Sequence, residues 1–419
     1  MALVDKKAPE LRFKGFSQDW ELCKFEDLLD KENGIRRGPF GSALKKEFFV
    51  KNSDFVVYEQ QNAIYDHYET RYKITEEKYN ELKAFNLTEN DFIMSGAGTI
   101  GRISKVPKGI KPGVFNQALI RFRIECKRTD SEYFIQFMRS EGMQKKLTGA
   151  NPGSAITNLV PMSEVKKWEI VVPQIEEQVR VGKFLKKLDN TITLHQRKLV
   201  QLKTLKQAYL QQLFPSDGEY VPKVRFANFN QDWELCKVAT MAKKTYGGGT
   251  PKTSVKEYWQ GDLPWIQSSD LIVDNLKHVM PTKFITQEAI SKSATKAIPK
   301  NSIAIVTRVG VGKLALIPYS YATSQDFLSL SLLNVDSYFG VYSLYKLLQN
   351  EINYIQGTSI KGITKGDLLE KSIKIPMDTV EQTGIGIFFN QLDEAITLHQ
   401  HKLESLNKLK QAYLQKMFI

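Results

Sequence analysis

Cationic and amide side chains gather in two short loops in the first half of the sequence. Residues 34–46 (GIRRGPFGSALKK) combine arginine and lysine with the glycine and proline that shape a loop. Arginine can make two parallel hydrogen bonds to a guanine edge, whereas lysine mainly contacts phosphates. Residues 58–64 (YEQQNAI) supply amide side chains, which suit adenine edges. Each loop alone is also typical of a solvated surface, but together they predict contact with a nucleic acid.

The second half of the sequence has loops of similar composition at equivalent places. Residues 246–253 (YGGGTPKT) and 265–270 (WIQSSD) again combine glycine with hydroxyl, amide and cationic groups. In the first half the predicted contact residues are Arg36, Arg37, Lys45, Lys46, Gln60, Gln61, Asn62, Arg71, Arg102, Asn116 and Gln117. In the second half they are Thr245, Tyr246, Thr250, Lys252, Gln267, Ser268, Ser269, Arg308, Lys313, Gln325 and Lys361.

Two glycine-rich turns look like nucleotide-binding motifs, and neither fits one. Residues 96–101 (GAGTIG) match GxGxxG, but the prolines that follow predict strand and turn instead of the helix that a dinucleotide site needs. Residues 309–313 (VGVGK) fail as a phosphate-binding P-loop, because Leu314 stands where serine or threonine is required. A cation, Arg102 or Lys313, ends each turn. A phosphate contact and a purely structural turn therefore both stay open.

The sequence contains no arrangement of residues that is typical of an enzyme. Its five histidines form no HExxH motif, and no serine nucleophile elbow or convincing carboxylate pair is present. Asn151-Pro152 lacks the second proline and the aromatic residue of a DNA-amine methyltransferase motif. The three cysteines form no CxxC pair, so no metal site is predicted. These absences favour a binding protein over a catalyst.

The net charge narrows the choice of partner. The chain of 419 residues carries a formal charge of +13, which favours a polyanion such as nucleic acid or an acidic membrane surface. No apolar run approaches the roughly 20 residues that span a bilayer, and residues 1–10 lack the apolar core of a signal peptide. Sparse cysteine is typical of a reducing cytoplasm. We therefore expect a cytoplasmic protein that binds no membrane.

The contact loops need a scaffold, and the sequence contains a long helical segment twice. Residues 188–214 and 392–418 are identical at 18 of 27 positions at a constant offset (392 − 188 = 204), and neither contains proline or glycine. Apolar residues recur at alternating spacings of three and four, with histidine and lysine in two gaps, as in a coiled-coil seam. The seam residues are Leu188, Ile192, Leu199, Leu202, Tyr209, Leu392, Ile396, Leu403, Leu406 and Tyr413.

Each repeated segment predicts a helix of roughly 37 residues, about 55 Å long, whose apolar seam must be covered. The simplest cover for each helix is the other one. A duplicated half-molecule favours a pseudo-twofold axis and antiparallel packing, although a parallel pair also fits the pattern.

A second repeat opens each half of the sequence. Residues 9–24 and 222–237 match at 11 of 16 positions and both end in QDWELCK. Their aromatic residues suit base stacking or a hydrophobic anchor, and the anchor is the favoured interpretation. Strand-like segments, for example 113–124, then follow the same order in both halves, with one amphipathic helix in each (131–147 and 338–355). The sequence therefore predicts one α+β fold used twice.

With these features the chain resembles the specificity subunit of a type I restriction-modification system. The resemblance rests on the duplicated layout, the LDxxIxLHQxKLxxLxxLKQAYLQ helices and the two opening motifs. Residues 247–271 and 357–368 also resemble the beginning and end of a target-recognition domain, and 151–159 (NPGSAITNL) is a looser counterpart of the latter. Gly384 and Gly386 depart from the uninterrupted helix, so the point where the second helix begins stays open.

The resemblance implies four segments: target-recognition domain 1 at 1–170, a spacer helix at 171–214, target-recognition domain 2 at 215–375 and a second spacer helix at 376–419. Each domain would read one half of a split, asymmetric site in double-stranded DNA. The helices would form an antiparallel coiled coil that fixes the gap and docks two modification subunits, which carry S-adenosylmethionine. Two restriction subunits would add translocation and cleavage driven by ATP and Mg²⁺. The chain itself would bind no cofactor and catalyse no reaction.

Two other classes of protein compete with this interpretation. A self-sufficient nuclease would cut DNA with a metal alone, and the missing catalytic cluster argues against it. A coiled-coil assembly protein would bind partners without a preference for DNA. The basic charge and the two different lobes on matching helices argue against that class.

Overall fold

The chain folds into two compact units of similar construction. Unit 1 consists of residues up to 195 together with 402–419, and unit 2 consists of residues 196–401. The computed structural model describes residues 8–97, 99–149, 161–308, 310–355 and 362–419. The expected contact residue Lys361 and the stretch at 151–159 lie outside the described residues. Each unit contains an α+β domain and parts of both long helices.

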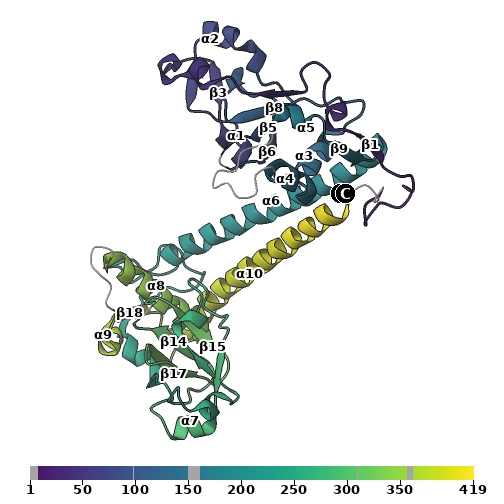
Figure 1. Ribbon diagram of the computed structural model, residues 1–419. Helices are drawn as coiled ribbons and strands as arrows, with labels where there is room; N and C mark the ends of the chain where they lie inside the picture. Colours follow the sequence, from purple (N-terminus) through teal and green to yellow (C-terminus); the bar gives the residue numbers. More distant parts are fainter. Residues whose placement is uncertain (1–7, 98, 150–160, 309, 356–361) are drawn as a thin grey trace. The chain divides into compact units, whose positions relative to one another are not determined.

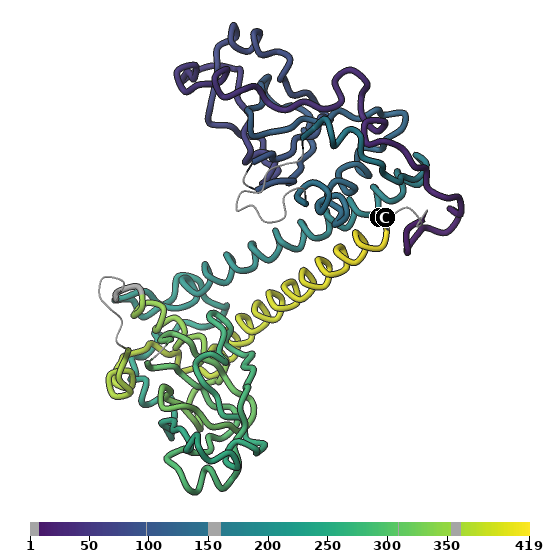
Figure 2. The backbone as a smooth tube through the Cα atoms, in the orientation of Figure 1, coloured from purple at the N-terminus to yellow at the C-terminus, as the bar shows by residue number. Residues whose placement is uncertain are grey.

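Two long helices supply the framework of both units. Helix α6 spans Ile175–Gln212 and helix α10 spans Thr379–Lys416. In unit 1 the start of α6 lies antiparallel to the end of α10, and the rings of Phe184 and Tyr413 are 4.9 Å apart (Figure 1 and Figure 2). In unit 2 the end of α6 packs on the start of α10 in the same way. The two long helices are therefore paired, as the repeats predict.

The expected seam residues lie on the inner faces of the helices. The buried ones are Leu188, Ile192, Leu202, Ile396, Leu403 and Leu406. The half-buried ones are Leu199, Tyr209, Leu392 and Tyr413. Helix α10 begins before both Gly384 and Gly386.

Unit 1 contains two sheets and a two-stranded ribbon. The four-stranded sheet is antiparallel with the order β2-β8-β5-β6. The three-stranded sheet has the order β4-β3-β7, with β3 and β7 parallel. The ribbon is β1-β9. The strands are β1 (Glu21–Lys24), β2 (Ile35–Arg37), β3 (Phe55–Tyr58), β4 (Tyr72–Ile74), β5 (Phe92–Ser95), β6 (Ile103–Lys105), β7 (Gly113–Phe115), β8 (Leu119–Phe122) and β9 (Glu169–Val172). The helices are α1 (Gln60–Tyr65), α2 (Glu76–Glu81), α3 (Ser131–Arg139), α4 (Glu141–Thr148) and α5 (Met162–Val165).

Unit 2 repeats this topology strand for strand. Its four-stranded sheet has the order β11-β17-β14-β15, its three-stranded sheet β13-β12-β16, and its ribbon β10-β18. The strands are β10 (Glu234–Lys237), β11 (Ala242–Gly247), β12 (Leu263–Ile266), β13 (Lys283–Ile285), β14 (Ser302–Val306), β15 (Leu314–Ile317), β16 (Ala322–Thr323), β17 (Phe327–Leu333) and β18 (Ser372–Ile375). The helices are α7 (Gln287–Ser291), α8 (Ser337–Ile355) and α9 (Lys365–Glu370). The prediction of one α+β fold used twice is confirmed.

Apolar layers cover both faces of each four-stranded sheet. In unit 1, Phe92 and Met94 pack toward α3 and the long helices, while Ile93 faces the three-stranded sheet. Because both faces of strand β5 are covered, its sequence (FIMS) does not alternate between apolar and polar residues as a strand with one solvent-exposed face would. Strand β14 (SIAIV) of unit 2 is buried on both faces for the same reason.

The residues at the far end of each long helix complete a domain core. In unit 1, Met417 and Phe418, which directly follow α10, are buried against α3. In unit 2, Leu213 and Phe214, which directly follow α6, are buried against α8. The core of each unit thus includes residues from the repeat that belongs to the other half of the sequence.

An arginine from each opening motif clamps the first turn of a long helix. Arg12 donates two hydrogen bonds of 2.7 Å to the carboxylate of Glu177. Arg225 donates bonds of 2.7 and 2.8 Å to Glu381. Both carboxylates are buried, and bidentate charged pairs of this kind are strong and directional. Trp233 also lies against Glu381. The opening motifs are therefore anchors, the interpretation that the sequence favours, and their tryptophans Trp20 and Trp233 are buried.

A shielded ion pair links the two long helices in each unit. In unit 1, Lys410 of α10 lies 2.5 Å from Asp189 of α6. In unit 2, Lys206 of α6 lies 2.6 Å from Asp393 of α10. The pairs occupy equivalent positions in the repeat (393 − 189 = 204 and 410 − 206 = 204). The lysines that interrupt the apolar seam thus have partners across it.

Each of these aspartates also accepts a hydrogen bond from a domain helix. Gln136 of α3 donates to Asp189 at 2.8 Å, and the hydroxyl of Tyr342 in α8 donates to Asp393 at 2.6 Å. Burial raises the pKa of Tyr342 and the neighbouring Asp393 carboxylate raises it further, so the hydroxyl stays protonated and donates. Each aspartate therefore joins three elements: two long helices and one domain helix.

Two equivalent glycines let the domain helices rest directly on the long helices. A Cβ atom on Gly182 of α6 would lie 2.5 Å from the backbone nitrogen of Tyr133. A Cβ atom on Gly386 of α10 would lie 2.8 Å from the backbone nitrogen of Phe339. Glycine near the start of α10 is thus a packing requirement, and it does not end the helix.

Two elements expected to be continuous are divided in the structure. Residues 131–147 form α3 and α4, because Ser140 adopts an extended backbone (φ −62°, ψ 151°) and caps α4. Residues 113–124 contain β7 and β8, which belong to different sheets. In both cases a short turn separates two segments of similar composition.

We predict that Lys206→Met destabilises unit 2, because it leaves the shielded carboxylate of Asp393 without its cation. Breaking a buried pair on one side costs about 3–5 kcal/mol. The free energy of unfolding in urea measures the effect. Lys292→Met, which breaks an exposed pair with Glu288, is the control and should change little. An equally small effect of Lys206→Met would contradict the structural role of the pair.

Candidate nucleic-acid interface

In unit 1 the segments that follow β2, β3, β5 and β7 meet at one edge of the sheets. The Gly38 N–H donates to the first residue of β8 at 2.9 Å. The Asn116 N–H donates to the last residue of β3 at 3.0 Å, and the Gly96 N–H donates to the turn between β7 and β8 at 2.7 Å. Backbone bonds therefore hold the four loops together, independently of the side chains that the loops present.

Unit 2 uses the same bonds at equivalent positions. Gly248 donates to the first residue of β17 at 3.4 Å, Ser324 to the last residue of β12 at 2.9 Å, and Thr307 to the β16–β17 turn at 2.7 Å. These bonds align the two edges residue by residue, although their sequences differ. We call this shared edge, with its four loops, the loop edge of each unit.

A glycine is required where the first loop crosses the last one. A Cβ atom on Gly38 would lie 1.9 Å from the carbonyl oxygen of Asn116. A Cβ atom on Gly248 would lie 1.8 Å from the carbonyl oxygen of Ser324. No other residue fits without movement of the backbone, so these crossings fix where each loop leaves the sheet.

Asn62 does not have the role that the sequence predicts for it. The side chain is fully buried. Its oxygen accepts the Glu59 N–H at 2.7 Å, and its nitrogen donates to the carbonyls of His67 and Glu69. The equivalent residue Asp270 caps its loop in the same way. The expectation of a base contact by Asn62 is therefore corrected: its polar groups are used to shape the loop.

Most of the other expected contact residues of unit 1 lie at the loop edge or beside it. The exposed ones are Arg37, Lys45, Lys46, Gln61, Arg71, Arg102 and Gln117. The half-buried ones are Arg36, Gln60 and Asn116. The Gln60 side chain donates to the carbonyl of Ala97, which joins the β3 loop to the β5 loop.

Two of the expected arginines are held by neighbouring side chains. The guanidinium of Arg36 lies 5.7 Å from the ring centre of Phe85, and its Nε atom is buried. Arg71 donates to both carboxylate oxygens of Glu59, at 3.0 and 3.3 Å, and stacks on Tyr72. Arg71 therefore presents only part of its guanidinium to a partner, and Arg36 is a weaker candidate than the exposed Arg37.

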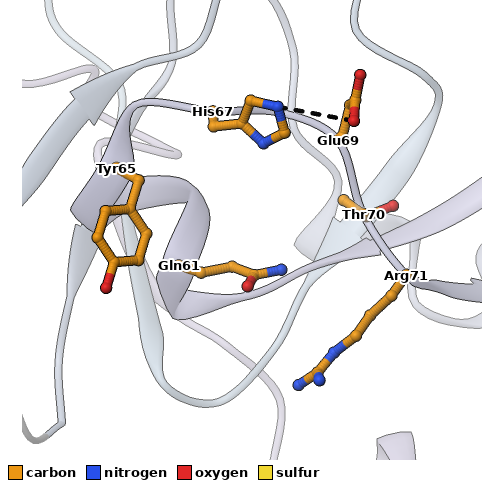
Figure 3. A pocket seen from close by; sticks show the side chains of 6 residues that line it. All are labelled: Gln61, Tyr65, His67, Glu69, Thr70 and Arg71. Carbon is orange, nitrogen blue, oxygen red and sulfur yellow. Dashed lines mark ion pairs between the residues drawn. The ribbon is translucent and has the colours of Figure 1, made fainter. Parts of the chain in front are cut away.

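A shallow hollow of about 380 Å³ lies beside α1 (Figure 3). The residues that line it are Gln61, Tyr65, His67, Glu69, Thr70 and Arg71. Tyr65 is 76% exposed at its rim, and His67 Nε2 lies 3.7 Å from Glu69 Oε2. The hollow offers an aromatic face, an amide and a guanidinium, which together suit the edge of a base.

The described contact residues expected in unit 2 lie at the equivalent edge or, for Thr245 and Tyr246, in the adjoining strand β11. The exposed ones are Thr245, Thr250, Lys252, Ser269, Arg308 and Gln325. The half-buried ones are Tyr246, Gln267, Ser268 and Lys313. Lys313 donates to the carbonyl of Ser268 at 3.0 Å, so this cation ties the β14 loop to the β12 loop.

Several residues at these edges escape the sequence-based prediction. Lys365 lies close to Arg308, and a Cβ atom on Gly247 would be 2.8 Å from its Nζ atom. Burial lowers the pKa of Lys365, and the Arg308 guanidinium lowers it further. Two cations gathered in this way suit a phosphate. In unit 1, Tyr65 and Phe40 are exposed aromatic residues. The only feature of the sequence that could have indicated them is a single aromatic residue in a polar loop.

The described residues contain no group of His, Cys, Asp and Glu side chains that could hold a metal ion. Within the same residues, no helix combines the length and apolar character needed to cross a membrane. What the loop edges offer is a set of cations, amides and hydroxyls on a rigid frame.

Comparison with known proteins identifies the family. The type I restriction modification DNA specificity domain matches residues 17–204 and again residues 230–408, which together are well over half of the chain. The chain belongs to this family. It is a DNA specificity subunit and belongs to a non-catalytic family within type I restriction-modification systems.

Individual relatives agree with this placement. The type I restriction enzyme MjaIX specificity subunit of Methanocaldococcus jannaschii is 28% identical over 197 residues, which are 45% of this chain and 44% of that protein. The putative MjaX specificity subunit of the same organism is 22% identical over 415 residues, 94% of this chain and 91% of that protein. The crystal structure of the type I S subunit from M. genitalium shares the fold, with a TM-score of 0.63, 14% identity and coverage of 98% and 99%.

We predict that Gly38→Ala disturbs the loop edge of unit 1 alone and Gly248→Ala that of unit 2 alone. The new methyl group must push a backbone carbonyl aside, and overpacking of this kind costs about 1–3 kcal/mol. Amide hydrogen exchange should show faster exchange in the two loops that cross at the substituted glycine. Gly366→Ala is the control, because a Cβ atom there meets nothing closer than 3.9 Å. Equal protection in all variants would contradict the crossing.

Proposed function

We propose that each α+β domain reads one half of a bipartite, asymmetric site in double-stranded DNA. The observation that carries the proposal is the pair of loop edges, which share one backbone frame and differ in their side chains. A common frame supports a common mode of docking, and different side chains support different sequences.

Equivalent positions in the two edges carry different hydrogen-bonding groups. The β2–β8 and β11–β17 registers show that Arg37 of unit 1 is equivalent to Gly247 of unit 2. The loop caps place Gln61 at the position of Ser269. Gln117 and Gln325 are the same residue at the same position. The proposed half-sites therefore differ in sequence, with one similar contact.

The charge of the chain supports an electrostatic contribution to binding. A net charge of +13 and exposed lysines at the edges suit phosphate contacts, which make affinity depend on salt. Base-edge contacts from the loops would then decide the sequence.

We infer that the domains correspond to residues 1–170 and 215–375, and that the spacer helices at 171–214 and 376–419 set the distance between the half-sites. Two recognition elements on one face of a duplex are about 34–36 Å apart. A helix of 38 residues is about 57 Å long. Its length is sufficient to hold that separation after the ends are used for packing.

The helices also have apolar side chains that point outward at repeated positions. Leu194 and Leu398, which are equivalent in the repeat, are 66% and 68% exposed. Leu205 and Leu409 form a second equivalent pair and are 42% and 43% exposed. Since the seam residues are turned inward, these outer leucines are the better candidates for docking. Their repetition supports two copies of one partner, the modification subunit.

The remaining parts of the proposal concern the partners. We expect two modification subunits, which bind S-adenosylmethionine and methylate an adenine in each half-site. Two restriction subunits would use ATP and Mg²⁺ for translocation and cleavage. The complex would act in the cytoplasm, and this chain would bind no cofactor of its own.

The test of the proposed function is genome-wide adenine methylation in cells that carry the chain with its modification subunit. A split motif is expected. Replacement of residues 20–165 by a homologous domain should change one half of that motif and leave the other half intact. A motif that is not split, or that survives the replacement unchanged, would overturn the proposal.

We predict that Arg37→Ala relaxes the sequence preference of one half-site only, because Arg37 is an exposed side chain of unit 1. Loss of one good base contact costs about 1–3 kcal/mol of discrimination. The methylated motif and the binding of single-base variants measure the effect. Lys46→Ala is the matched control and should weaken binding to all sequences alike. A uniform loss of affinity for Arg37→Ala would assign it to the phosphate backbone instead.

We predict that a seven-residue insertion after Gln196, matched by one after Gln400, lengthens the gap and preserves both half-sites. Seven residues keep the heptad phase and add about 10 Å of helix, the length of about three base pairs. An insertion after Asp217, in the loop that follows α6, is the control and should leave the gap unchanged. An unchanged gap in the helix variant, with methylation retained, would exclude the helices as the spacer.

A further inference from the structure

Phe40 is a conspicuous side chain at the loop edge of unit 1, and none of the contacts described so far gives it a role. It is 88% exposed. A single exposed apolar residue is ordinary on a protein surface and by itself needs no explanation. What distinguishes Phe40 is the way in which the backbone holds it and the groups that surround it.

The backbone around Phe40 is fixed on both sides. Two residues earlier, Gly38 lies so close to the Asn116 carbonyl that there is no room for a Cβ atom. Pro39 is buried. The Phe40 carbonyl then accepts the Ala43 N–H at 2.9 Å, which closes a tight helical turn. The buried proline anchors the loop and leaves the neighbouring Phe40 ring facing outward. Because the backbone is already fixed, little backbone freedom is lost when a partner binds.

The groups around the ring are those of the proposed DNA contact. A Cβ atom on Gly41 would lie 2.9 Å from Oε1 of Gln117, so this amide is directly beside the Phe40 loop. Arg37 precedes the ring by three residues, and Lys45 and Lys46 follow it, all exposed. A partner that suits this surface is a polyanion that also offers an apolar group next to a hydrogen-bonding edge.

Unit 2 has a smaller apolar group at the equivalent position. Because Gly38 corresponds to Gly248, Phe40 corresponds to Thr250, which is also exposed. Gln117 corresponds to Gln325 in the same alignment. At these equivalent positions each edge therefore carries an apolar group, a ring or a methyl group, and a glutamine.

We propose that Phe40 contacts the C5-methyl group of a thymine in the half-site that unit 1 reads. The proposal rests on the proposed function and adds a specificity-determining residue to it. In the major groove only thymine carries a methyl group, and phenylalanine and threonine are both suited to it. Glutamine bonds to N6 and N7 of adenine, the partner of thymine in the pair. Gln117 and Phe40 together then read one A·T pair or two adjacent ones.

The test replaces each thymine of the unit 1 half-site in turn by deoxyuridine, which lacks only the methyl group. Binding is measured with the full chain and its modification subunits, on duplexes that carry the methylated motif. We expect one position at which deoxyuridine weakens binding about fourfold, the factor that one buried methyl group provides. Phe40→Ala should abolish that difference, and Phe40→Leu should retain part of it.

Two controls separate this contact from other effects. Leu22→Ala removes another exposed apolar side chain of unit 1, on β1, and should leave the deoxyuridine effect intact. Deoxyuridine in the other half-site should have the same effect on Phe40→Ala as on the unchanged protein. An unchanged melting temperature of Phe40→Ala is expected, because the ring is not part of a core.

Three outcomes would overturn the inference. Phe40→Ala that keeps the deoxyuridine effect shows that another residue reads the methyl group. Phe40→Ala that weakens binding to all duplexes alike shows a contact without sequence preference. The third outcome combines two results: the unchanged protein shows no deoxyuridine effect, and the fluorescence of 2-aminopurine in the duplex reports unstacked bases only when Phe40 is present. That outcome shows that the ring is a wedge between base pairs. Failure of the proposed function looks different: the unchanged chain would then show no split motif at all.

Discussion

The rest of the structure depends on the shielded lysine–aspartate pairs in the helix seam. An apolar seam alone tolerates a shift by one heptad, because leucine then still meets leucine. Lys206 opposite Asp393, and Lys410 opposite Asp189, fix one register, since any shift leaves a shielded charge without its partner. Because each aspartate also accepts a bond from a domain helix, the same constraint positions the loop edges on the helices.

The frame of each domain and its contact residues are separate parts of the sequence. Gly38 and Gly248 set the crossings of the loops, and Asn62 and Asp270 cap them. These four residues shape the backbone and do not face a partner. The side chains between them project outward and differ between the units. A fold of this kind permits new contact residues without a new arrangement of the backbone.

The sequence predicts the repeated parts well, and the loop edges only in outline. Helix pairing follows from a seam of some four heptads, because each long apolar seam must be covered by a partner helix. Asn62 is different, because an amide in a short polar loop has the same appearance whether it caps the loop or faces outward. The packing of Arg36 on Phe85 and the approach of Lys365 to Arg308 join residues far apart in the chain, so no local pattern reveals them.

The docking of Met417 and Phe418 in unit 1 has a consequence for the order of events during synthesis. Domains generally fold as they leave the ribosome, the N-terminal one first. The first domain cannot complete its core in that order, because these two residues are translated after the whole of the second domain. The second domain has Leu213 and Phe214 available from the outset. The later part of the chain is thus complete first, and a frameshift within it leaves apolar surface of the earlier part uncovered for chaperones and proteases.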